Sequence, residues 1–407
     1  MQNKALIIIG GGLMQIPLIK EARNMGRYII VLDRNEHAEG MELADIPVCA
    51  DIKNTGLCVD ECMRIRKKIP EYCSISGVLT VGTDFSTTVA AIAAALGLPG
   101  INFDCALCAK NKILMRRCFA EKSCPQPRFC GADNLEEASV AVKDLPFPLV
   151  IKPADNMGAR GVKRVDTIAE LQDWFPVAEG FAHTEDTEKK VIIEEYISGS
   201  ELSIDALIYD NEIFITGVAD RIIRHEPYFI EIGHIMPSQL AEEQTSAAVY
   251  AFKQGIRALG IRTGMAKGDI KINEKGAFIG EIAARLSGGY MSGYTYPYAT
   301  GVNLMRNAVR IAENTPPSGL TPSKKWCSIE RAIIAPKEGI IRQINGIDKV
   351  KKLSGIKNVF LFYTPGQYVK LPQNNVEKGG NIIAAAPSYA ETLNITENAL
   401  QNIRFEY

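Results

Sequence analysis

The sequence of 407 residues lacks an excess of charge of either sign. Its 46 lysines and arginines nearly balance its 47 aspartates and glutamates, which leaves a net charge of −1. Proteins that bind nucleic acid or an anionic membrane surface usually carry an excess of basic residues. The balance therefore gives no reason to expect either partner, and any phosphate binding must depend on the local placement of a few basic side chains.

Long hydrophobic runs are also missing. No stretch reaches the roughly 18 consecutive apolar residues of a membrane-spanning helix. The apolar run Ala5–Gly10 near the start is shorter than the core of a usual secretory signal peptide. We therefore expect no membrane span, and a cytoplasmic protein in which thiols stay reduced.

Histidine is scarce, and this bears on the ten cysteines. Cys105 and Cys108 form one C-x-x-C pair, and Cys58 and Cys62 lie four positions apart. None of the four histidines lies close in sequence to either pair, whereas a structural zinc site needs four ligands at characteristic spacings. The sequence therefore favours ordinary buried or reduced thiols over a metal site.

The glycine-rich start lacks one residue of the dinucleotide-binding fingerprint. An apolar strand pattern ends at Gly10, Gly12 follows, and a second strand pattern ends at Asp33. The fingerprint requires a third glycine where helix and strand pack closely, and Gln15 stands at that position. A dehydrogenase that binds NAD(P) or FAD is therefore disfavoured, and we interpret the segment as a scaffold domain or as one wall of a substrate pocket.

Hydrophobic periodicity divides the chain into three parts. Residues 1–108 alternate strand and helix patterns and predict a small parallel α/β domain of Rossmann-like type. Residues 109–315 combine helices with hairpin patterns, one of them around Asp210 and Asn211, and predict an α+β domain with antiparallel sheets. A proline-rich linker follows, and residues 316–407 are expected to form a compact C-terminal lobe.

Two lysines and a glycine-containing loop form the first group of candidate site residues. Lys112 opens a helix pattern, and Lys152 ends an apolar strand pattern. The loop Asp155–Gly161 comes directly after it and contains Gly158 and Gly161, without the Gly-Lys-Ser/Thr of a P-loop. Lysine suits phosphate oxygens, and glycine lets backbone N–H groups approach a phosphate closely. Taken singly, each feature is also compatible with an ordinary surface position.

A strand that ends in acidic residues forms the second group. It leads into Glu194, Glu195 and Ile197, and a turn separates these residues from Glu201. Adenine needs backbone donors and acceptors beside apolar walls, and a ribose needs a carboxylate acceptor. The segment offers both, although a solvated acidic edge strand would have the same pattern.

The third group begins with a carboxylate pair. Asp269 and Glu281 lie on two strand patterns joined by the turn Glu274–Gly276, so they can face each other across a hairpin. Two hard oxygen ligands that share phosphate oxygens suit Mg²⁺, whereas two exposed acids are the plain alternative. Arg285 follows, and arginine can clamp a carboxylate or a phosphate with two hydrogen bonds. The turn after it, formed by Ser287, Gly288 and Gly289, offers backbone donors for an anion.

Taken in chain order, these features resemble the ATP-grasp superfamily. The matching pattern is a lysine, a strand with a lysine and a glycine loop, Glu-Glu-x-x-x-Gly-x-Glu, and then an aspartate before Glu-Ile-x-x-Arg, over about residues 109–313. The flanking parts fit the usual three-part layout, so the resemblance covers most of the chain. It looks most like the carboxylate–amine ligases related to phosphoribosylglycinamide synthetase and L-amino acid ligases. Biotin carboxylase and D-alanine–D-alanine ligase are more distant.

The resemblance implies a Rossmann-like pre-ATP-grasp domain, an ATP-grasp domain with a mobile lid at about residues 120–190, and a small C-terminal lobe. It also implies that ATP and Mg²⁺ are the cofactors. Lys112 and Lys152 would contact the ATP phosphates, with Gly158–Gly161 as a cap. The hinge residues, Glu194 to Ile197, would hold adenine, and Glu201 would take the ribose hydroxyls.

For the reacting end, the resemblance implies that Asp269 and Glu281 bind Mg²⁺ and that Arg285 stabilises an acyl phosphate. The stretch around Glu231 and His234 resembles a substrate-side segment of amino acid ligases. One departure concerns Ala283, because the superfamily usually has asparagine there as a further metal ligand. The departure leaves the number of bound magnesium ions open.

The implied activity is an ADP-forming ligase that activates a small-molecule carboxylate and transfers it to an amine. Two alternatives stay open. One is a purine-pathway ligase or a formate-dependent transferase that acts on a phosphorylated ribose. The other, which Ala283 makes plausible, is a nucleotide-binding regulatory protein without turnover. The acid and the amine cannot be named from the sequence, and a homodimer would be common for the superfamily.

Overall fold

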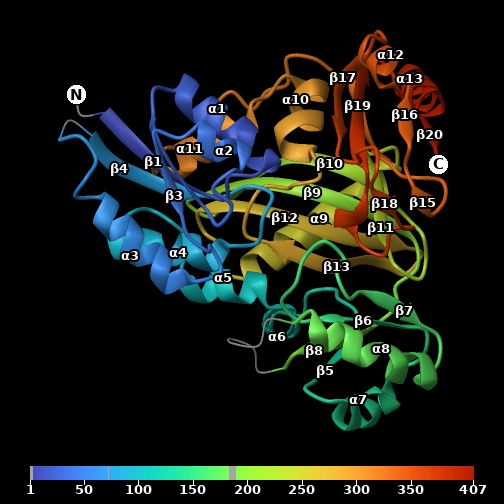
Figure 1. Cartoon of the computed structure of the whole chain (residues 1–407). Helices are drawn as coiled ribbons and strands as arrows, with labels where there is room; N and C mark the ends of the chain where they lie inside the picture. Colours follow the sequence, from blue (N-terminus) through green and yellow to red (C-terminus); the bar gives the residue numbers. More distant parts are fainter. Residues whose placement is uncertain (1–2, 72, 183–188) are drawn as a thin grey trace.

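The computed structural model describes residues 3–71, 73–182 and 189–407. Positions 1, 2 and 72 of the expected N-terminal domain and positions 183–188 of the expected lid lie outside these described residues. Within the described part, none of the helices combines the length and the apolar composition needed to cross a bilayer. Three sheets of four or more strands organise the fold (Figure 1).

The N-terminal part is a parallel four-stranded sheet with helices on both faces, as the sequence predicts. Alternate apolar side chains of the first strand serve the two faces, because Leu6 and Ile8 pack in one hydrophobic cluster and Ile7 and Ile9 in another. The strand order is β3-β2-β1-β4, with β1 (Asn3–Ile9), β2 (Tyr28–Asp33), β3 (Ile46–Cys49) and β4 (Cys73–Leu79). Its helical segments are η1 (Leu13–Gln15), α1 (Ile16–Asn24), α2 (Glu39–Glu42), α3 (Thr55–Ile65) and α4 (Ser86–Leu96).

A second, antiparallel sheet forms a lobe that projects from the main body (Figure 1). Its order is β5-β8-β6-β7, and its apolar face is covered by helices whose side chains share one cluster with the strands. The lobe begins within the range expected for the lid, about residues 120–190, but its strand β8 extends beyond that range to Glu195. The elements are β5 (Phe129–Ala132), α7 (Leu135–Ala141), η2 (Val142–Asp144), β6 (Leu149–Pro153), β7 (Lys163–Val165), α8 (Ile168–Gly180) and β8 (Val191–Glu195).

The largest sheet has eight antiparallel strands in the order β13-β12-β9-β10-β11-β14-β19-β17. Asp210 and Asn211 both have positive φ at the turn between β9 and β10, as a tight hairpin requires. Its first five strands are β9 (Ser200–Tyr209), β10 (Glu212–Arg224), β11 (Ile230–Met236), β12 (Gly264–Asn273) and β13 (Gly276–Ala283). The helical segments beside them are α5 (Phe103–Lys110), α6 (Lys112–Glu121), α9 (Glu242–Ala258), η3 (Met291–Thr295), α10 (Tyr296–Thr300) and α11 (Leu304–Ala312).

The C-terminal lobe does not have a large sheet of its own. Its strands β14 (Cys327–Ile333), β17 (Ile356–Leu361) and β19 (Gly380–Ala386) extend the central sheet, because β14 pairs with β11 in register from Met236 to Gly233. This continuity places the C-terminal strands at one end of the sheet, next to β11. The remaining elements are β15 (Gly339–Ile340), β16 (Gln343–Asn345), α12 (Ile347–Lys351), β18 (Tyr368–Val369), η4 (Asn375–Glu377), α13 (Tyr389–Asn402) and β20 (Arg404–Glu406).

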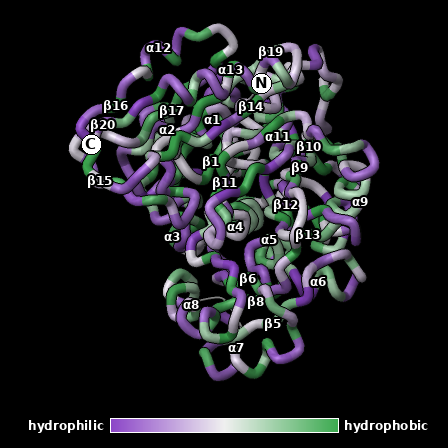
Figure 2. Tube along the Cα trace, turned by 90° about the vertical axis from the view of Figure 1, so that its right-hand side faces the viewer, coloured by the Kyte–Doolittle hydropathy of each residue, from purple (hydrophilic) through white to green (hydrophobic). Residues whose placement is uncertain are grey.

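Helix α11 joins the N-terminal sheet to the central sheet. Leu304 and Ala308 share one buried cluster with Leu6 of β1 and with Leu207 of β9, and Figure 2 shows hydrophobic segments in the interior where β1 and α11 lie. The contact is closest at Gly77 of β4, where an added Cβ atom would lie 2.7 Å from the backbone oxygen of Ala312. The N-terminal part is therefore held against the central sheet by direct backbone packing.

We expect Gly77→Ala to lower the unfolding free energy by about 1 to 3 kcal/mol, because the new methyl group forces β4 and α11 apart. Gly56→Ala is the matched control. Gly56 lies exposed in the first turn of α3, and an added Cβ would meet nothing nearer than the Asn54 side chain at 3.7 Å. Urea unfolding of both variants measures the effect, and equal midpoints would contradict the tight contact.

Candidate active site

One cavity of about 730 Å³ lies where the three sheets meet, a size usual for a small-molecule site. It is lined by loops of the N-terminal part, by the lid, by the central sheet and by the C-terminal lobe. Gly161 is the one candidate residue that does not line it. The candidate residues that line it are Lys112, Lys152, Gly158, Glu194, Glu195, Ile197, Glu201, Glu231, His234, Asp269, Glu281, Arg285, Ser287, Gly288 and Gly289.

The two candidate glycines of the loop Asp155–Gly161 differ in their surroundings. Gly158, with φ +72°, lies at the cavity. Gly161, with φ +71°, is packed beneath α8, where an added Cβ would come within 3.0 Å of Phe181 and 3.1 Å of Pro153. Its glycine is explained by this close packing and by its backbone conformation rather than by an approach to a ligand.

One face of the central sheet presents a grid of polar side chains to the cavity. On β9 the alternate residues Glu201, Ser203 and Asp205 lie opposite Lys271, Asp269 and Lys267 of β12. The intervening residues of β9 are apolar and pack in the core on the other face. Because side chains alternate across a strand, this pattern places six polar groups side by side.

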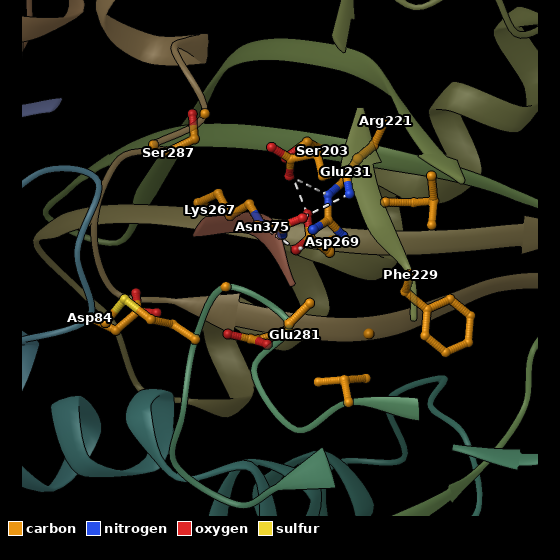
Figure 3. A pocket seen from close by; sticks show the side chains of 18 of the residues that line it. Asp84, Ser203, Arg221, Phe229, Glu231, Lys267, Asp269, Glu281, Ser287 and Asn375 are labelled. Atoms are coloured by element: carbon orange, nitrogen blue, oxygen red, sulfur yellow. Dashed lines mark hydrogen bonds and ion pairs between the residues drawn. The ribbon is translucent and has the colours of Figure 1, made fainter. Parts of the chain in front are cut away.

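The carboxylate pair lies in this grid. Asp269 and Glu281 are direct cross-strand partners of β12 and β13, so both side chains are on the same face of the hairpin. Asp269 contacts Lys267 and also Arg221 at 3.4 Å (Figure 3). Burial would raise the pKa of Asp269, but Arg221 and Lys267 lower it. Asp269 is therefore held ionised beside these two cations.

The donor set fits a magnesium ion that is shared with a phosphate. In the described part of the chain, no group of three or more His, Cys, Asp or Glu side chains is placed to hold a metal ion. Mg²⁺ is commonly bound by one or two carboxylates with phosphate oxygens and water as its other ligands. Asp269 and Glu281 could supply those two carboxylates. All ten cysteines are free thiols.

The two candidate lysines occupy different parts of the cavity. Lys112 is the first residue of α6, and its Nζ donates to the backbone oxygen of Asn156 at 2.7 Å while lying 3.6 Å from Oε2 of Glu281. It therefore connects the glycine loop with the carboxylate pair. Lys152 lies on β6 and pairs with Oε2 of Glu194 at 2.6 Å.

The side chain of Glu194 belongs to a buried ion cluster. Its Oε1 accepts from Nε of Arg116 at 2.7 Å, and its carboxylate is almost fully removed from solvent. Burial alone would raise the pKa of Glu194, but Arg116 and Lys152 together lower it to about 2. The side chain of Glu194 is therefore occupied by these two cations, and only its backbone could contact a ligand. Arg116, which holds this carboxylate, was not predicted from the sequence.

An apolar slot lies beside the hinge. Tyr196 and Phe229 stack with ring centroids 6.0 Å apart, and the backbone N–H groups of Glu195 and Tyr196 donate to Arg128 and Pro148. Ile197 is the next residue and is buried. Such a slot suits a flat heteroaromatic ring. The apolar side chains that line it are Pro127, Val150, Tyr196, Ile197, Ile223, Phe229 and Phe278.

Arg221 is the centre of a second buried ion cluster. Its guanidinium contacts the carboxylates of Glu201, Glu231 (2.9 Å) and Asp269 (3.4 Å). Burial would lower the pKa of Arg221, but these three carboxylates raise it well above its usual value. Glu201 also pairs with Lys271 at 3.0 Å, so the candidate ribose acceptor is already held by two cations.

The candidates Glu231 and His234 lie on β11 at the opposite end of the grid from Glu281. Burial would raise the pKa of Glu231, but His234, Arg221 and Lys378 lower it. Nδ1 of His234 lies 3.2 Å from Oε2 of Glu330 on β14, which fixes the ring in the sheet. This end of the cavity therefore offers an anionic group held between cations.

The N-terminal part contributes a wall through the loop after β4. Asp84 pairs with Nε of Arg285 at 2.7 Å, and Gly82 donates its N–H to the backbone oxygen of Leu286 at 3.2 Å. Beyond this arginine, Asp205 accepts hydrogen bonds from both the N–H and the hydroxyl of Ser287. Burial raises the pKa of Asp205 to about 6. Asp205 of β9 thus holds the turn that follows Arg285 against the central sheet.

The glycine-rich start also reaches the cavity, at Gly12 and Gln15. Asp33 accepts from the N–H of Gly11 at 2.8 Å, so its carboxylate holds the loop itself. The side chain of Gln15 lies against Gly10, where an added Cβ would be 3.2 Å from its Cδ. The space that a dinucleotide pyrophosphate would need beside Gly10 is therefore filled by Gln15.

Two protein-family models match the chain. The model described as an ATP-grasp domain matches residues 145–293, and the model described as L-amino acid ligase C-terminal domain 2 matches residues 331–407. Together they cover most of the lid, the polar grid and most of the C-terminal lobe. The ATP-grasp match lies inside residues 109–313, where the order of motifs resembles the same superfamily.

Curated relatives and solved structures agree with these matches. A formate-dependent phosphoribosylglycinamide formyltransferase of Saccharolobus solfataricus is 25% identical over 94% of each chain. An L-arginine-specific L-amino acid ligase of Bacillus subtilis is 23% identical over 69% of this chain and 67% of its own length. The crystal structure of an L-amino acid ligase from Bacillus licheniformis superposes with a TM-score of 0.85 at 23% identity, over 100% of this chain and 99% of the other. At that identity the last likeness shows the fold.

We expect Glu194→Gln to lower the unfolding free energy at neutral pH by about 3 to 5 kcal/mol, because it leaves Arg116 and Lys152 buried without their counter-charge. The folded-state pKa of Glu194 is lowered from 4.5 to about 2. The stabilising contribution of this carboxylate is therefore complete above about pH 4.5 and is lost as the pH falls toward 2. The difference in unfolding free energy between the wild type and Glu194→Gln should therefore decrease as the pH falls from about 4.5 toward 2.

Glu195→Gln is the control on the same strand. Glu195 pairs with the exposed Arg128 at 3.4 Å, and such a pair contributes at most about 1 kcal/mol. Urea unfolding at pH 7 and at pH 3 measures both variants. Similar losses for Glu194→Gln and Glu195→Gln, or a gap that does not change with pH, would contradict the buried ion cluster.

Proposed function

This chain is an ATP-dependent ligase of the ATP-grasp superfamily, and we propose that it activates a small-molecule carboxylate as an acyl phosphate and transfers it to an amine, with release of ADP and phosphate. The observation that carries the proposal is the convergence of Asp269, Glu281, Lys112 and the glycine loop on one cavity. These groups come from separate parts of the chain and meet with opposite charges facing one another.

The nucleotide would lie along the cavity from the apolar slot to the carboxylate pair. Tyr196, Phe229 and their apolar neighbours form the adenine end. Lys152 and Lys112 lie between that end and Glu281 and are placed to neutralise phosphate charge. Asp269 and Glu281 would hold the metal, and Mg²⁺ bound there would offset the negative charge on the phosphates.

One magnesium ion fits the residues present better than two. Ala283 is the direct cross-strand partner of Lys267, and Lys267 in turn contacts Asp269. The position where relatives usually have an asparagine ligand is therefore next to a fixed cation. We propose that Lys267 supplies the positive charge that a second metal ion would otherwise bring.

The reaction we propose has two steps. A carboxylate oxygen of the acid attacks the γ-phosphorus of ATP, the bond to the bridging oxygen breaks, and ADP leaves. The amine nitrogen then attacks the acyl carbon, loses a proton, and inorganic phosphate leaves. Arg285 and the amides of Gly288 and Gly289 would stabilise the negative oxygen of that tetrahedral intermediate, whereas the amide of Ser287 already donates to Asp205. Closure of the lid would exclude water, which would hydrolyse the acyl phosphate.

The substrate end of the cavity favours amino acids. Arg285 can bind a carboxylate, and Glu231, held ionised by its neighbours, can bind an ammonium group. Both line the same cavity. A second candidate, a transferase acting on a phosphorylated ribose, draws support from the glycine-rich loop at Gly12 and Gln15, which also lines the cavity.

A screen of amino acids in pairs with Mg-ATP should release ADP for at least one pair. We expect ADP and phosphate and no AMP, because the proposed acid is phosphorylated and not adenylylated. With an active acid and hydroxylamine, a hydroxamate should form. Detection of AMP would contradict the proposed chemistry, whereas tight ATP binding with no ADP release across the panel would favour a regulatory protein without turnover.

Glu281→Gln should abolish turnover, with a loss of at least about 100-fold in the rate of ADP release, equivalent to about 2.7 kcal/mol. The amide is a poorer metal ligand than the carboxylate, while the apolar slot and the lysines stay intact, so the nucleotide should still bind. The control is Glu274→Gln, an exposed acid in the turn of the same hairpin. ADP release and nucleotide titration are measured for both. Wild-type turnover in Glu281→Gln would show that the metal assignment is wrong.

A further inference from the structure

A short segment of the C-terminal lobe, Asn374–Lys378, lies over the cavity, and we name it the clasp. It contains the single turn η4 and contributes Asn375, Val376 and Lys378 to the cavity lining. Figure 3 shows Asn375 among Glu231, Asp269 and Lys267. We infer that Asn375 is a positioning residue: it fixes the glycine loop of the lid relative to the strand that carries Glu231.

Asn375 contacts both partners through different atoms. Its backbone N–H donates to the backbone oxygen of Gly158 at 2.9 Å. Its side-chain Oδ1 accepts from the backbone N–H of Glu231 at 2.8 Å. Gly158 lies in the loop between β6 and β7 of the lid, and Glu231 lies on β11 of the central sheet. One residue of the C-terminal lobe therefore joins the lid to the substrate end of the central sheet.

Hydrogen bonds within the clasp and to neighbouring residues hold it in place. Oδ1 of Asn374 accepts from the N–H of Val376 at 3.1 Å, and Nδ2 of Asn374 donates to Glu377 at 2.8 Å. The hydroxyl of Tyr363, a buried residue, donates to the backbone oxygen of Glu377 at 2.8 Å. Lys378 donates from Nζ to the backbone oxygen of Glu231 at 2.9 Å. A segment held in this way can fix the position of a loop that bonds to it.

The glycine loop Asp155–Gly161 bonds to the clasp and has an unfavourable backbone conformation. Gly158 and Gly161 have φ values of +72° and +71°, and Ala159 between them has φ +59°. A residue with a Cβ atom is strained in this conformation. The loop therefore needs contacts from outside to stay in this shape, and the hydrogen bond from Asn375 and the one from Lys112 to Asn156 provide them.

This inference rests on the proposed function, since the loop is taken to cap the nucleotide. Its consequence is that the loop adopts its closed shape only when the clasp is in place, so that closure over the phosphates is tied to the strand that holds the substrate end. Loss of the side-chain link should misplace the loop relative to Glu231. Loss of the backbone link should also free the loop from the clasp.

Three substitutions separate the two links. Asn375→Asp keeps an acceptor oxygen for Glu231, and Asn375→Ala removes it. Asn375→Pro removes the N–H donor to Gly158 as well, and proline is tolerated at the first position of a helical turn, which Asn375 occupies in η4. Gln373→Ala is the control, because Gln373 is exposed and bonds to Glu377 through its backbone N–H, which the substitution retains.

The readout is cleavage by trypsin at Arg160, which lies in the loop, with and without a non-hydrolysable ATP analogue and Mg²⁺. We expect the analogue to protect the wild type, Asn375→Asp and Gln373→Ala equally. With the analogue bound, cleavage should be about 3- to 10-fold faster in Asn375→Pro, the effect of losing hydrogen bonds of ordinary strength. Asn375→Ala should fall between the two groups. Mass spectrometry identifies the cleaved bond.

Wild-type protection in Asn375→Pro and Asn375→Ala would overturn the inference. So would equal loss of protection in Asn375→Asp and Asn375→Ala, which would point to a merely structural position. Titration of the same analogue by calorimetry keeps the two proposals apart. If the wild type neither binds nor is protected by the analogue, the proposed function fails; if it binds and is protected and the variants match it, only the role of Asn375 fails.

Discussion

Side chains alternate across a β-strand, and the site depends on that constraint in the central sheet. From Glu201 to Asp205 on β9 and from Lys267 to Lys271 on β12, every second residue is polar, and the residues between them are buried on the other face. Register with β13 then fixes the distance between Asp269 and Glu281 without any help from loops. A shift of one residue in either strand would turn the carboxylates into the core. The apolar face thus specifies the register, and the register specifies the site.

Placing so many charges on one buried face requires that they neutralise each other. Arg221 is one cation that contacts three anions, Glu201, Glu231 and Asp269. Glu194 shows the opposite arrangement, because it is one anion between the two cations Arg116 and Lys152. A buried charge without a partner costs several kcal/mol. Under the proposed function, a polyphosphate with its metal would enter a region whose charges are already paired. Lys112 would then exchange its contact with Glu281 for phosphate oxygens.

The sequence predicted the parts of this site that follow from local pattern. The parallel N-terminal domain, the turn at Asp210 and the hairpin between Asp269 and Glu281 are local in sequence, and the structure has them. Arg221 was missed because its meaning depends on three acids from three other strands. Its only local signal was a charged residue beside the apolar pair Ile222 and Ile223. Asn375 and Asp84 gave no local signal, since their contacts are made across the whole chain. The pairing of the C-terminal lobe with the central sheet also gave no local signal, because strand pairing between β11 and β14 cannot be read from periodicity.

The extension of the central sheet by the C-terminal strands explains why the end of the chain can act at the site at all. Because β14 pairs with β11, Glu330 lies next to His234, and β19 begins two residues after Lys378. The segment that precedes β19 is thereby placed over Glu231. A lobe joined only by the proline-rich linker would have no fixed relation to the glycine loop. The central sheet thus aligns the two carboxylates near one of its ends and, through β14 and β19 near the other end, also sets the position of the clasp. This is why the hydrogen bond from Asn375 to Gly158 can form with a fixed geometry.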